Sequence, residues 1–226
     1  MHAPRTLRCS ALLLKVDLHV HTVYSDGRGT VEEVLRVARA KGLDGLAITD
    51  HVTLDGYFEA KSYESGLFIL PGYEIPTDAG HVLVLGLEVL PPERGFMRYE
   101  ELIRWARDNG GFTVLAHPAV GRARWDKWVR CKPDAVEVLN ASYPFSRYFV
   151  GKGVRIALRL SVPMVGGSDA HYPRCVGDAY TILDVKNPGD WNPLKALKNG
   201  IAGFDGRLSP LPARLRIGLG YILSVL

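Results

Sequence analysis

The feature that most constrains the fold is a repeated unit in which a short apolar segment ends at a histidine or a carboxylate. Residues 46–49 lead into His51, and residues 112–116 lead into His117. Helical patterns separate segments of this kind along the chain. Short strands of the parallel type that alternate with helices predict an α/β fold. The number of such strands before residue 170 suits a barrel or a barrel-like sheet.

The boundaries of the elements follow from hydrophobic periodicity and from capping residues. The predicted strands are 15–21, 46–49, 67–70, 81–87, 112–116, 135–139 and 163–165. The predicted helices are 31–41, 99–109, 146–160 and 190–200. The first helix has the clearest limits, because Thr30 and Glu33 form a capping-box pattern and Gly42 is a typical residue to follow its end.

Length and composition are those of a globular chain. The 226 residues are 47% hydrophobic and 23% charged, which excludes a disordered or coiled-coil protein. We expect an N-terminal extension over 1–14, a single domain over 15–206, and an apolar tail over 207–226 that docks as a helix. The net charge of +4 permits an anionic substrate without requiring nucleic acid.

The sequence also bears on the cellular setting. No apolar run is long enough for a membrane-spanning helix. The three cysteines are scattered, and they match neither a disulfide framework nor a metal knuckle. A reducing cytoplasm is therefore the simplest expectation for the location.

Histidines and carboxylates carry the chemical signal. His19 and His21 are two residues apart in a predicted strand, so their side chains point to the same side. Most of the other candidates follow the ends of predicted strands, where α/β barrels place their active sites. The exception is His81, which begins a strand. The candidate metal ligands are His19, His21, Asp26, His51, Glu74, His81, His117, Asp169 and His171.

Imidazole and carboxylate ligands together suit zinc, manganese or iron. Nine candidate ligands are too many for one ion, so the pattern predicts two or three divalent ions that share a bridging carboxylate. A single H-x-H pair in a strand has an ordinary structural explanation. The whole set does not, because each residue would then need its own unrelated role.

These residues occur in motifs that resemble the PHP (polymerase and histidinol phosphatase) superfamily, in order and over about residues 15–185. The motifs are Asp17-Leu18-His19-Val20-His21, Ser25-Asp26-Gly27, Ile48-Thr49-Asp50-His51, Pro71-Gly72-Tyr73-Glu74, Gly80-His81, Ala116-His117-Pro118 and Gly167-Ser168-Asp169-Ala170-His171. The resemblance implies a single-domain, distorted (β/α)7 barrel with a dinuclear or trinuclear phosphoesterase site.

The resemblance also implies how the ligands divide among the ions. The first ion would be held by His19, His21, Glu74 and Asp169. The second would be held by Glu74, His117 and His81. The third would be held by Asp26, His51 and His171. The residues implied in catalysis are Glu74, Asp169 and His171. His81 has an alternative role as a core histidine or a partner of a ligand, and Asp17 and Asp50 are expected to support the histidines.

The sequence identifies residues that could contact the substrate less clearly than it identifies the metal ligands. Arg174, Arg122 and Arg124 follow candidate ligands on loops and are candidates for binding a phosphate through bidentate hydrogen bonds. Each of them is equally compatible with a solvated surface position. Tyr24, Tyr143 and Tyr172 are candidates for stacking on a base or a sugar.

Two departures from the family pattern bear on the substrate. Val52 stands where many members that act on small molecules carry an aspartate. The segment between His81 and His117 is too short for the helical lid domain of related nucleotide phosphatases. We therefore expect a more open site than theirs.

The function implied by the resemblance is hydrolysis of a phosphoester by a metal-activated hydroxide. The expected substrate is a small phosphorylated metabolite or a nucleotide. One alternative is an exonuclease that trims short single strands of nucleic acid. Another is a non-catalytic metal-binding scaffold, against which the complete ligand set argues. The oligomeric state is left open by the sequence.

Overall fold

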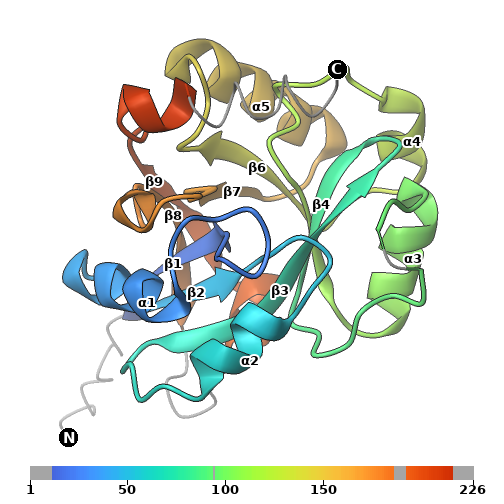
Figure 1. Cartoon of the computed structure of the whole chain (residues 1–226). Helices are drawn as coiled ribbons and strands as arrows, with labels where there is room; N and C mark the ends of the chain where they lie inside the picture. Colours follow the sequence, from blue (N-terminus) through green and yellow to red (C-terminus); the bar gives the residue numbers. More distant parts are fainter. Residues whose placement is uncertain (1–11, 94, 186–191, 216–226) are drawn as a thin grey trace, which may run out of the picture.

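The computed structural model describes residues 12–93, 95–185 and 192–215 of the chain (Figure 1). One sheet of nine strands runs through this part in the order β7-β6-β5-β4-β3-β2-β1-β8-β9. The strands are β1 (Leu12–Val20), β2 (Gly45–Ile48), β3 (Phe68–Thr77), β4 (Gly80–Leu85), β5 (Phe112–Leu115), β6 (Ala135–Asn140), β7 (Met164–Gly167), β8 (Ala179–Val185) and β9 (Ile201–Gly206).

Helices surround this sheet. They are α1 (Val31–Ala40), α2 (Asp55–Lys61), α3 (Tyr99–Asp108), α4 (Trp125–Arg130), α5 (Ser146–Leu160) and α6 (Pro193–Asn199), with a 3-10 turn η1 (Pro173–Cys175). Figure 1 shows α1 and α2 on one side of the sheet, α3 and α4 on another and α5 along a third. No helix in the described part of the chain is long and apolar enough to cross a membrane.

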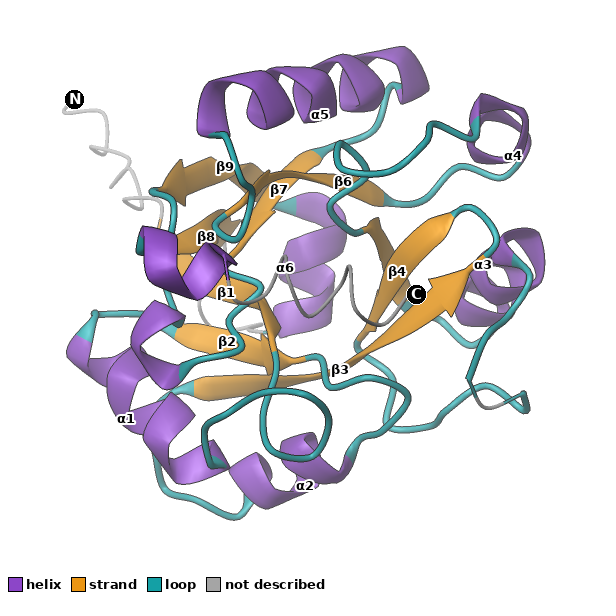
Figure 2. Cartoon of the chain, turned by 45° about the horizontal axis from the view of Figure 1, so that its top comes forward, coloured by secondary structure: helices purple, strands orange, loops and turns teal. Residues whose placement is uncertain are grey.

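The α/β barrel expected from the sequence is confirmed, because the sheet curls until β7 meets β8 (Figure 2). Gly166 donates its N–H to Thr181 Oγ1 (3.1 Å), and Thr181 Oγ1 lies 2.8 Å from the Gly166 carbonyl oxygen. A Cβ atom on Gly166 would lie only 2.9 Å from the Tyr180 carbonyl oxygen. Glycine at this position therefore allows the two edges of the sheet to approach.

The exact count of seven β/α units is not reproduced. The described sheet has nine strands, and β4, β8 and β9 run antiparallel to their neighbours. The strands β8 and β9 were not predicted. The helices α2 and α4 were also missed, and both are short helices without a side-chain N-cap bond.

Several boundaries differ from the expected ones. The first strand begins at Leu12 rather than at residue 15, because Leu12 to Val16 pair with β8. The predicted strand 67–70 extends to Thr77, because β3 leaves β2 after Pro71 and pairs with β4 as a hairpin. Of the predicted helical tail 207–226, residues 216–226 lie outside the described residues, and residues 211–215 form a short helical turn.

The capping box predicted at Thr30 and Glu33 is confirmed. Thr30 Oγ1 accepts a hydrogen bond from the Glu33 N–H (3.2 Å), and the Glu33 carboxylate accepts one from the Thr30 N–H (3.0 Å). Asn192 Oδ1 accepts from the Lys195 N–H at the start of α6. These bonds satisfy N–H groups that have no partner inside the helix.

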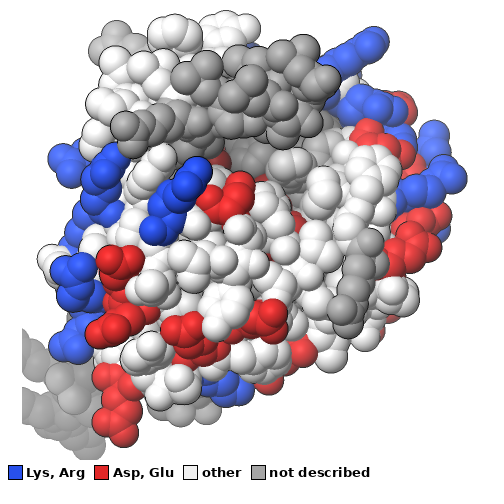
Figure 3. Space-filling model, in the orientation of Figure 1, with Lys and Arg blue, Asp and Glu red and all other residues white. Residues whose placement is uncertain are grey.

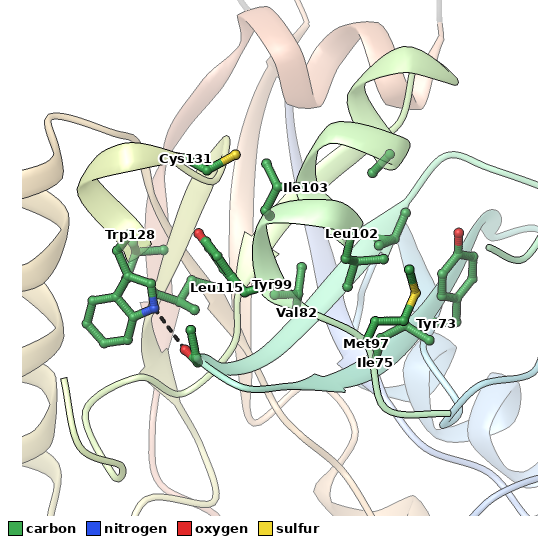
Figure 4. Packing of buried hydrophobic residues seen from close by; sticks show 14 of the residues in the cluster. Tyr73, Ile75, Val82, Met97, Tyr99, Leu102, Ile103, Leu115, Trp128 and Cys131 are labelled. Carbon is green, nitrogen blue, oxygen red and sulfur yellow. Dashed lines mark hydrogen bonds between the residues drawn. The ribbon is translucent and has the colours of Figure 1, made fainter. Parts of the chain in front are cut away.

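Two packed regions hold the barrel in shape. Inside it, Leu18, Leu83 and Val165 pack together with Leu197 of α6, and Figure 2 shows α6 behind the ring of strands. Outside it, α3 and α4 cover the β3–β4 hairpin through a cluster that contains Tyr99 and other buried residues (Figure 4). Because α6 packs at the end of the barrel where β1 and β5 begin, the opposite end is left for the candidate ligands.

Candidate metal centre

His19 and His21 lie at the end of β1 and point the same way, as their spacing predicted. Their Nε2 atoms are 3.1 Å apart, and both rings are buried. Val20, between them, faces the opposite side and packs with Val34 of α1. A Cβ atom on Gly167 would lie 2.7 Å from the His19 Cβ. Glycine at the end of β7 therefore lets this strand pass directly beside the histidines.

Glu74 of β3 is the centre of the arrangement. Its Oε1 atom lies 3.0 Å from His81 Nδ1 and 3.1 Å from His117 Nε2. Its Oε2 atom lies 3.3 to 3.4 Å from a ring nitrogen of each of three further histidines, His19, His21 and His51. A carboxylate whose two oxygens face two different sets of imidazoles has the form of a bridging ligand.

Asp169 completes the buried part of the site. Its Oδ1 atom is 3.5 Å from the Nε2 atoms of His19 and His21, and its Oδ2 atom accepts a hydrogen bond from Asn140 Nδ2 (3.1 Å). Asp169 has a backbone φ of 51°, and His117 has one of 30°. Residues held in such uncommon conformations concentrate at functional sites.

Asp26, His51 and His171 form a more exposed group. Asp26 Oδ2 lies 3.0 Å from His171 Nε2 and 3.6 Å from His51 Nε2. The Asp26 side chain is 53% exposed and that of His51 is 31% exposed. Asp26 Oδ1 also reaches His21 Nδ1 at 3.5 Å, which connects this group to the buried histidines.

All nine candidate ligands therefore come together at one end of the barrel. Their ligand atoms fall into overlapping groups in which all atoms lie within 4.8 Å of one another. We call His19, His21, Glu74, His81, His117 and Asp169 the inner cluster. We call Asp26, His51 and His171 the outer cluster. Imidazole nitrogens and carboxylate oxygens that converge in this way fit divalent ions such as zinc, manganese or iron.

Sequence comparison decides the family. A family model described as PHP domain matches residues 17–125, and one described as PHP-associated matches residues 151–200. The uncharacterized protein MJ1587 of Methanocaldococcus jannaschii is 36% identical over 144 residues, which are 57% of this chain and 82% of that protein. The chain belongs to the PHP family.

Two further relatives of this PHP protein match over shorter stretches. A phosphoribosyl 1,2-cyclic phosphate 1,2-diphosphodiesterase of Eggerthella lenta is 38% identical over 80 residues, 32% of this chain and 30% of that protein. A 5'-3' exoribonuclease of Haemophilus influenzae is 39% identical over 66 residues, 28% of this chain and 24% of that protein.

A solved structure agrees on the fold. It is a two-domain protein from Bacteroides vulgatus that contains a predicted PHP-like metal-dependent phosphoesterase. It superposes with a TM-score of 0.67 at 23% identity, over 84% of this chain and 63% of that chain. The barrel of this PHP protein is therefore the architecture of that phosphoesterase.

Burial and charge set the protonation of the PHP site. Burial alone would lower the pKa of His19, but Asp169, Glu137 and Glu74 outweigh it and hold that pKa well above its ordinary value. Burial likewise opposes ionisation of Glu74, yet the surrounding histidines keep its pKa well below the usual range. Divalent ions would replace the protons on these imidazoles.

Glu137 and Asn140 of β6 are site residues that sequence reasoning missed. Glu137 Oε1 lies 3.0 Å from His19 Nδ1, and its Oε2 atom accepts from the His117 N–H (2.9 Å) and from Asn140 Nδ2 (2.9 Å). The Glu137 side chain thereby fixes the ring of His19 and the backbone of His117. The available signal was a glutamate in the middle of an apolar strand.

Asp17 and Asp50 support the site differently from the expectation. Neither carboxylate bonds a histidine ring within the described part of the chain. Asp17 accepts backbone N–H groups of Ser168 (2.9 Å) and Gly177 (2.8 Å), so it holds the turn after β7. Burial raises the pKa of Asp17 to about 6.

Asp50 orders the loop that carries Asp26. It accepts hydrogen bonds from the N–H of Thr22 (2.7 Å) and from Ser25 Oγ (2.7 Å). Each oxygen of a carboxylate can accept more than one hydrogen bond. The oxygens of Asp50 accept from donors of this loop rather than from a histidine.

The candidate substrate residues fall into different environments. Arg124 Nη1 donates to the Asp78 carbonyl oxygen (2.8 Å), whereas Arg122 and Arg174 are exposed. The Arg174 guanidinium lies 4.9 Å from the centre of the Tyr172 ring. Tyr143 is fully buried, so the expectation that it stacks on a base or sugar is wrong.

Proposed function

We propose that this PHP protein hydrolyses a phosphoester bond of a small phosphorylated metabolite or nucleotide, with divalent ions held by the inner and outer clusters. The observation that carries the proposal is the convergence of five histidines on one carboxylate, Glu74, within a group of nine ligand-type side chains. Its two oxygens face separate sets of imidazoles, which is the arrangement that two neighbouring ions need.

The ligand atoms divide naturally among three positions. The first would use His19, His21, Glu74 and Asp169. The second would use Glu74, His81 and His117. The third would use Asp26, His51 and His171. Ions at these positions would supply Lewis-acid charge that polarises a phosphoryl group and makes water a better nucleophile.

The chain itself contributes orientation and charge. Glu137 fixes the ring of His19 through a 3.0 Å contact with Nδ1, which leaves Nε2 facing the cluster. Asn140 Nδ2 bonds both Glu137 and Asp169, so it ties the two carboxylates together. Such preorganised groups do not have to reorient during the reaction.

The exposed outer cluster is the side from which we propose the substrate enters. Arg174 follows His171 by three residues and is exposed, so it is the favoured candidate to bind a phosphate oxygen. Arg122 is a second candidate on the loop after His117. Arg124 is a weaker candidate, because its guanidinium already donates to the Asp78 carbonyl oxygen.

The distribution of charge favours a small substrate over a long nucleic acid. Figure 3 shows Lys and Arg side chains mainly toward two sides of the face in view, and its centre is mostly uncharged or acidic. A continuous basic groove is the usual support for a nucleic acid strand. The similarity to an exoribonuclease over 66 residues supports the second candidate function, trimming of short single strands.

Hydrolysis of a panel of substrates tests the proposal, followed by phosphate release for the monoesters and by separation of the products for the cyclic phosphates and oligonucleotides. The panel contains nucleoside monophosphates, bisphosphates, cyclic phosphates, histidinol phosphate and short oligonucleotides, each with Mn²⁺ and with a chelator. We expect Mn²⁺-dependent hydrolysis of one class, absent in Glu74→Gln. Hydrolysis of oligonucleotides alone would favour the nuclease. No hydrolysis of any class by protein with measured bound Mn²⁺ would contradict the proposal.

A further inference from the structure

The turn of the β3–β4 hairpin, Asp78 and Ala79, is bound by three side chains from one short segment. Arg124 Nη1 donates to the Asp78 carbonyl oxygen (2.8 Å), and Lys127 Nζ bonds Asp78 Oδ2. Trp128 Nε1 donates to the Ala79 carbonyl oxygen (2.8 Å), as Figure 4 shows. We call Arg124, Lys127 and Trp128 the α4 clamp.

The clamp joins the two pieces of chain that carry His81 and His117. His81 comes two residues after Ala79, and His117 begins the loop that runs into α4. Both rings face Glu74 Oε1, at 3.0 and 3.1 Å, and their centres are 5.2 Å apart. The spacing of the two rings is set first by the pairing of β4 with β5, in which the Ala116 N–H donates to the His81 carbonyl oxygen (3.0 Å), and the clamp adds a second link between the hairpin turn and this loop.

Lys127 and Trp128 are the less exposed members of the clamp, whereas the Arg124 side chain is 40% exposed. Trp128 is fully buried, the Lys127 side chain is 17% exposed, and the Asp78 carboxylate also accepts the Tyr99 N–H (3.0 Å). A hydrogen bond to a charged group in such a position stabilises more than an exposed surface pair does. His117 has an uncommon backbone conformation, with a φ of 30°. Such a conformation persists only where contacts with neighbouring segments stabilise it.

We propose that the α4 clamp positions His81 and His117 for one ion, so that Lys127 and Trp128 are positioning residues for that ion alone. The inference rests on the proposed function, because it requires a divalent ion at Glu74, His81 and His117. The clamp makes no bond to the outer cluster among the described contacts, so the ion held there is expected to be unaffected.

Mn²⁺ binding to the full chain tests this inference. The variants are Lys127→Met, which keeps most of the stem, Lys127→Arg, which restores a cation, and Trp128→Phe, which removes only the indole N–H donor and the outer part of the ring. The matched control is Lys61→Met, because Lys61 pairs with Glu88 at 2.9 Å on the surface and neither contacts a candidate ligand. Bound Mn²⁺ per chain is counted at buffered free concentrations, and electron paramagnetic resonance detects coupled pairs of ions.

We expect Lys127→Met to weaken the binding of one Mn²⁺ by about tenfold, while the other binding steps stay unchanged. The signal of the coupled pair should then disappear at free Mn²⁺ levels where the wild type keeps it. Trp128→Phe should act in the same direction, Lys127→Arg should restore most of the loss, and Lys61→Met should match the wild type.

Two outcomes would overturn the clamp as a positioning device. In one, Lys127→Met and Trp128→Phe bind Mn²⁺ as the wild type does. In the other, every binding step weakens equally and the midpoint of thermal unfolding falls, which is the result of a purely structural role. Failure of the proposed function looks different, because the wild type itself would then hydrolyse no substrate of the panel or would bind no Mn²⁺, whatever the clamp variants do.

Discussion

The inner and outer clusters use the same two residue types, but the protein holds them differently. His19 and Glu74 of the inner cluster are buried, and Glu137 Oε1 fixes the His19 ring through a 3.0 Å contact with Nδ1. In the outer cluster the Asp26 side chain is 53% exposed and His51 is 31% exposed. His19, His21 and Glu74 are therefore held in the interior and Asp26 and His51 at the solvent boundary, whereas His81 (27% exposed), His117 (23%) and His171 (14%) lie between these limits.

The backbone that carries each cluster explains the difference. His19, Glu74 and His81 belong to strands whose positions are fixed by pairing with their neighbours. Asp26 lies in a turn that Asp50 orders through side-chain hydrogen bonds. We infer that the inner cluster keeps its ions and that the outer cluster binds its ion more weakly, where substrate can reach it.

The largest effect should come from Glu74→Gln, which removes the bridging charge of the inner cluster. Loss of several kcal/mol of charge stabilisation predicts a fall in kcat of at least about 10³-fold. The measurement is the rate of phosphate release together with bound metal. Glu88→Gln is the control, and a Glu74→Gln variant with wild-type turnover would contradict the assignment.

Glu137→Gln should weaken the inner cluster without removing a ligand. Partners that orient ligand histidines typically contribute ten- to a hundredfold to metal affinity, so we expect a loss of that size in Mn²⁺ affinity and in kcat. Titration with Mn²⁺ measures it, with Glu100→Gln on α3 as the control, because Glu100 pairs with Arg104 and Arg130 rather than with a candidate ligand. Unchanged affinity would mean that the contact with His19 is only structural.

Asp26→Asn should have a smaller and more selective effect. Because this carboxylate is exposed and screened by solvent, we expect about a tenfold loss of affinity for one ion. The inner ions should remain bound. Counting bound Mn²⁺ per chain distinguishes this result from a loss of all ions together, which would remove the distinction between the clusters.

The smallest effect is expected for Arg174→Ala at the open side of the site. If the guanidinium binds phosphate before the reaction, KM should rise by roughly three- to tenfold while kcat changes little. Steady-state kinetics on the substrate found in the panel measure both. Arg130→Ala is the control, and an unchanged KM would assign Arg174 to the surface.

The residues that sequence could place are those whose position follows from local rules. His19 and His21 share a face because strand side chains alternate, and the ends of parallel strands meet at one edge of the sheet. The helix starts at Thr30 and Asn192 were predictable for the same reason, since each cap uses a residue only a few positions away.

The residues that sequence could not place depend on contacts between distant segments. Glu137 meets His19 across 118 positions of sequence, and only the closure of the barrel brings β6 and β7 beside β1. Likewise, Lys127 contacts Asp78 from the short helix α4. This helix has no side-chain cap bond, so no local sequence pattern predicted it. Asp17 and Asp50 were found as polar neighbours, but their partners are backbone N–H groups and, for Asp50, hydroxyl groups that only the fold reveals.

Mn²⁺ binding to the metal-depleted full chain is the most direct test of the account. Free Mn²⁺ is raised in steps, and the bound ions per chain are counted at each step. We expect the inner ions to bind first and tightly, and a further ion to bind at higher free Mn²⁺ together with the onset of substrate hydrolysis. Binding of all ions in a single step, or no binding at all, would contradict the division into inner and outer clusters.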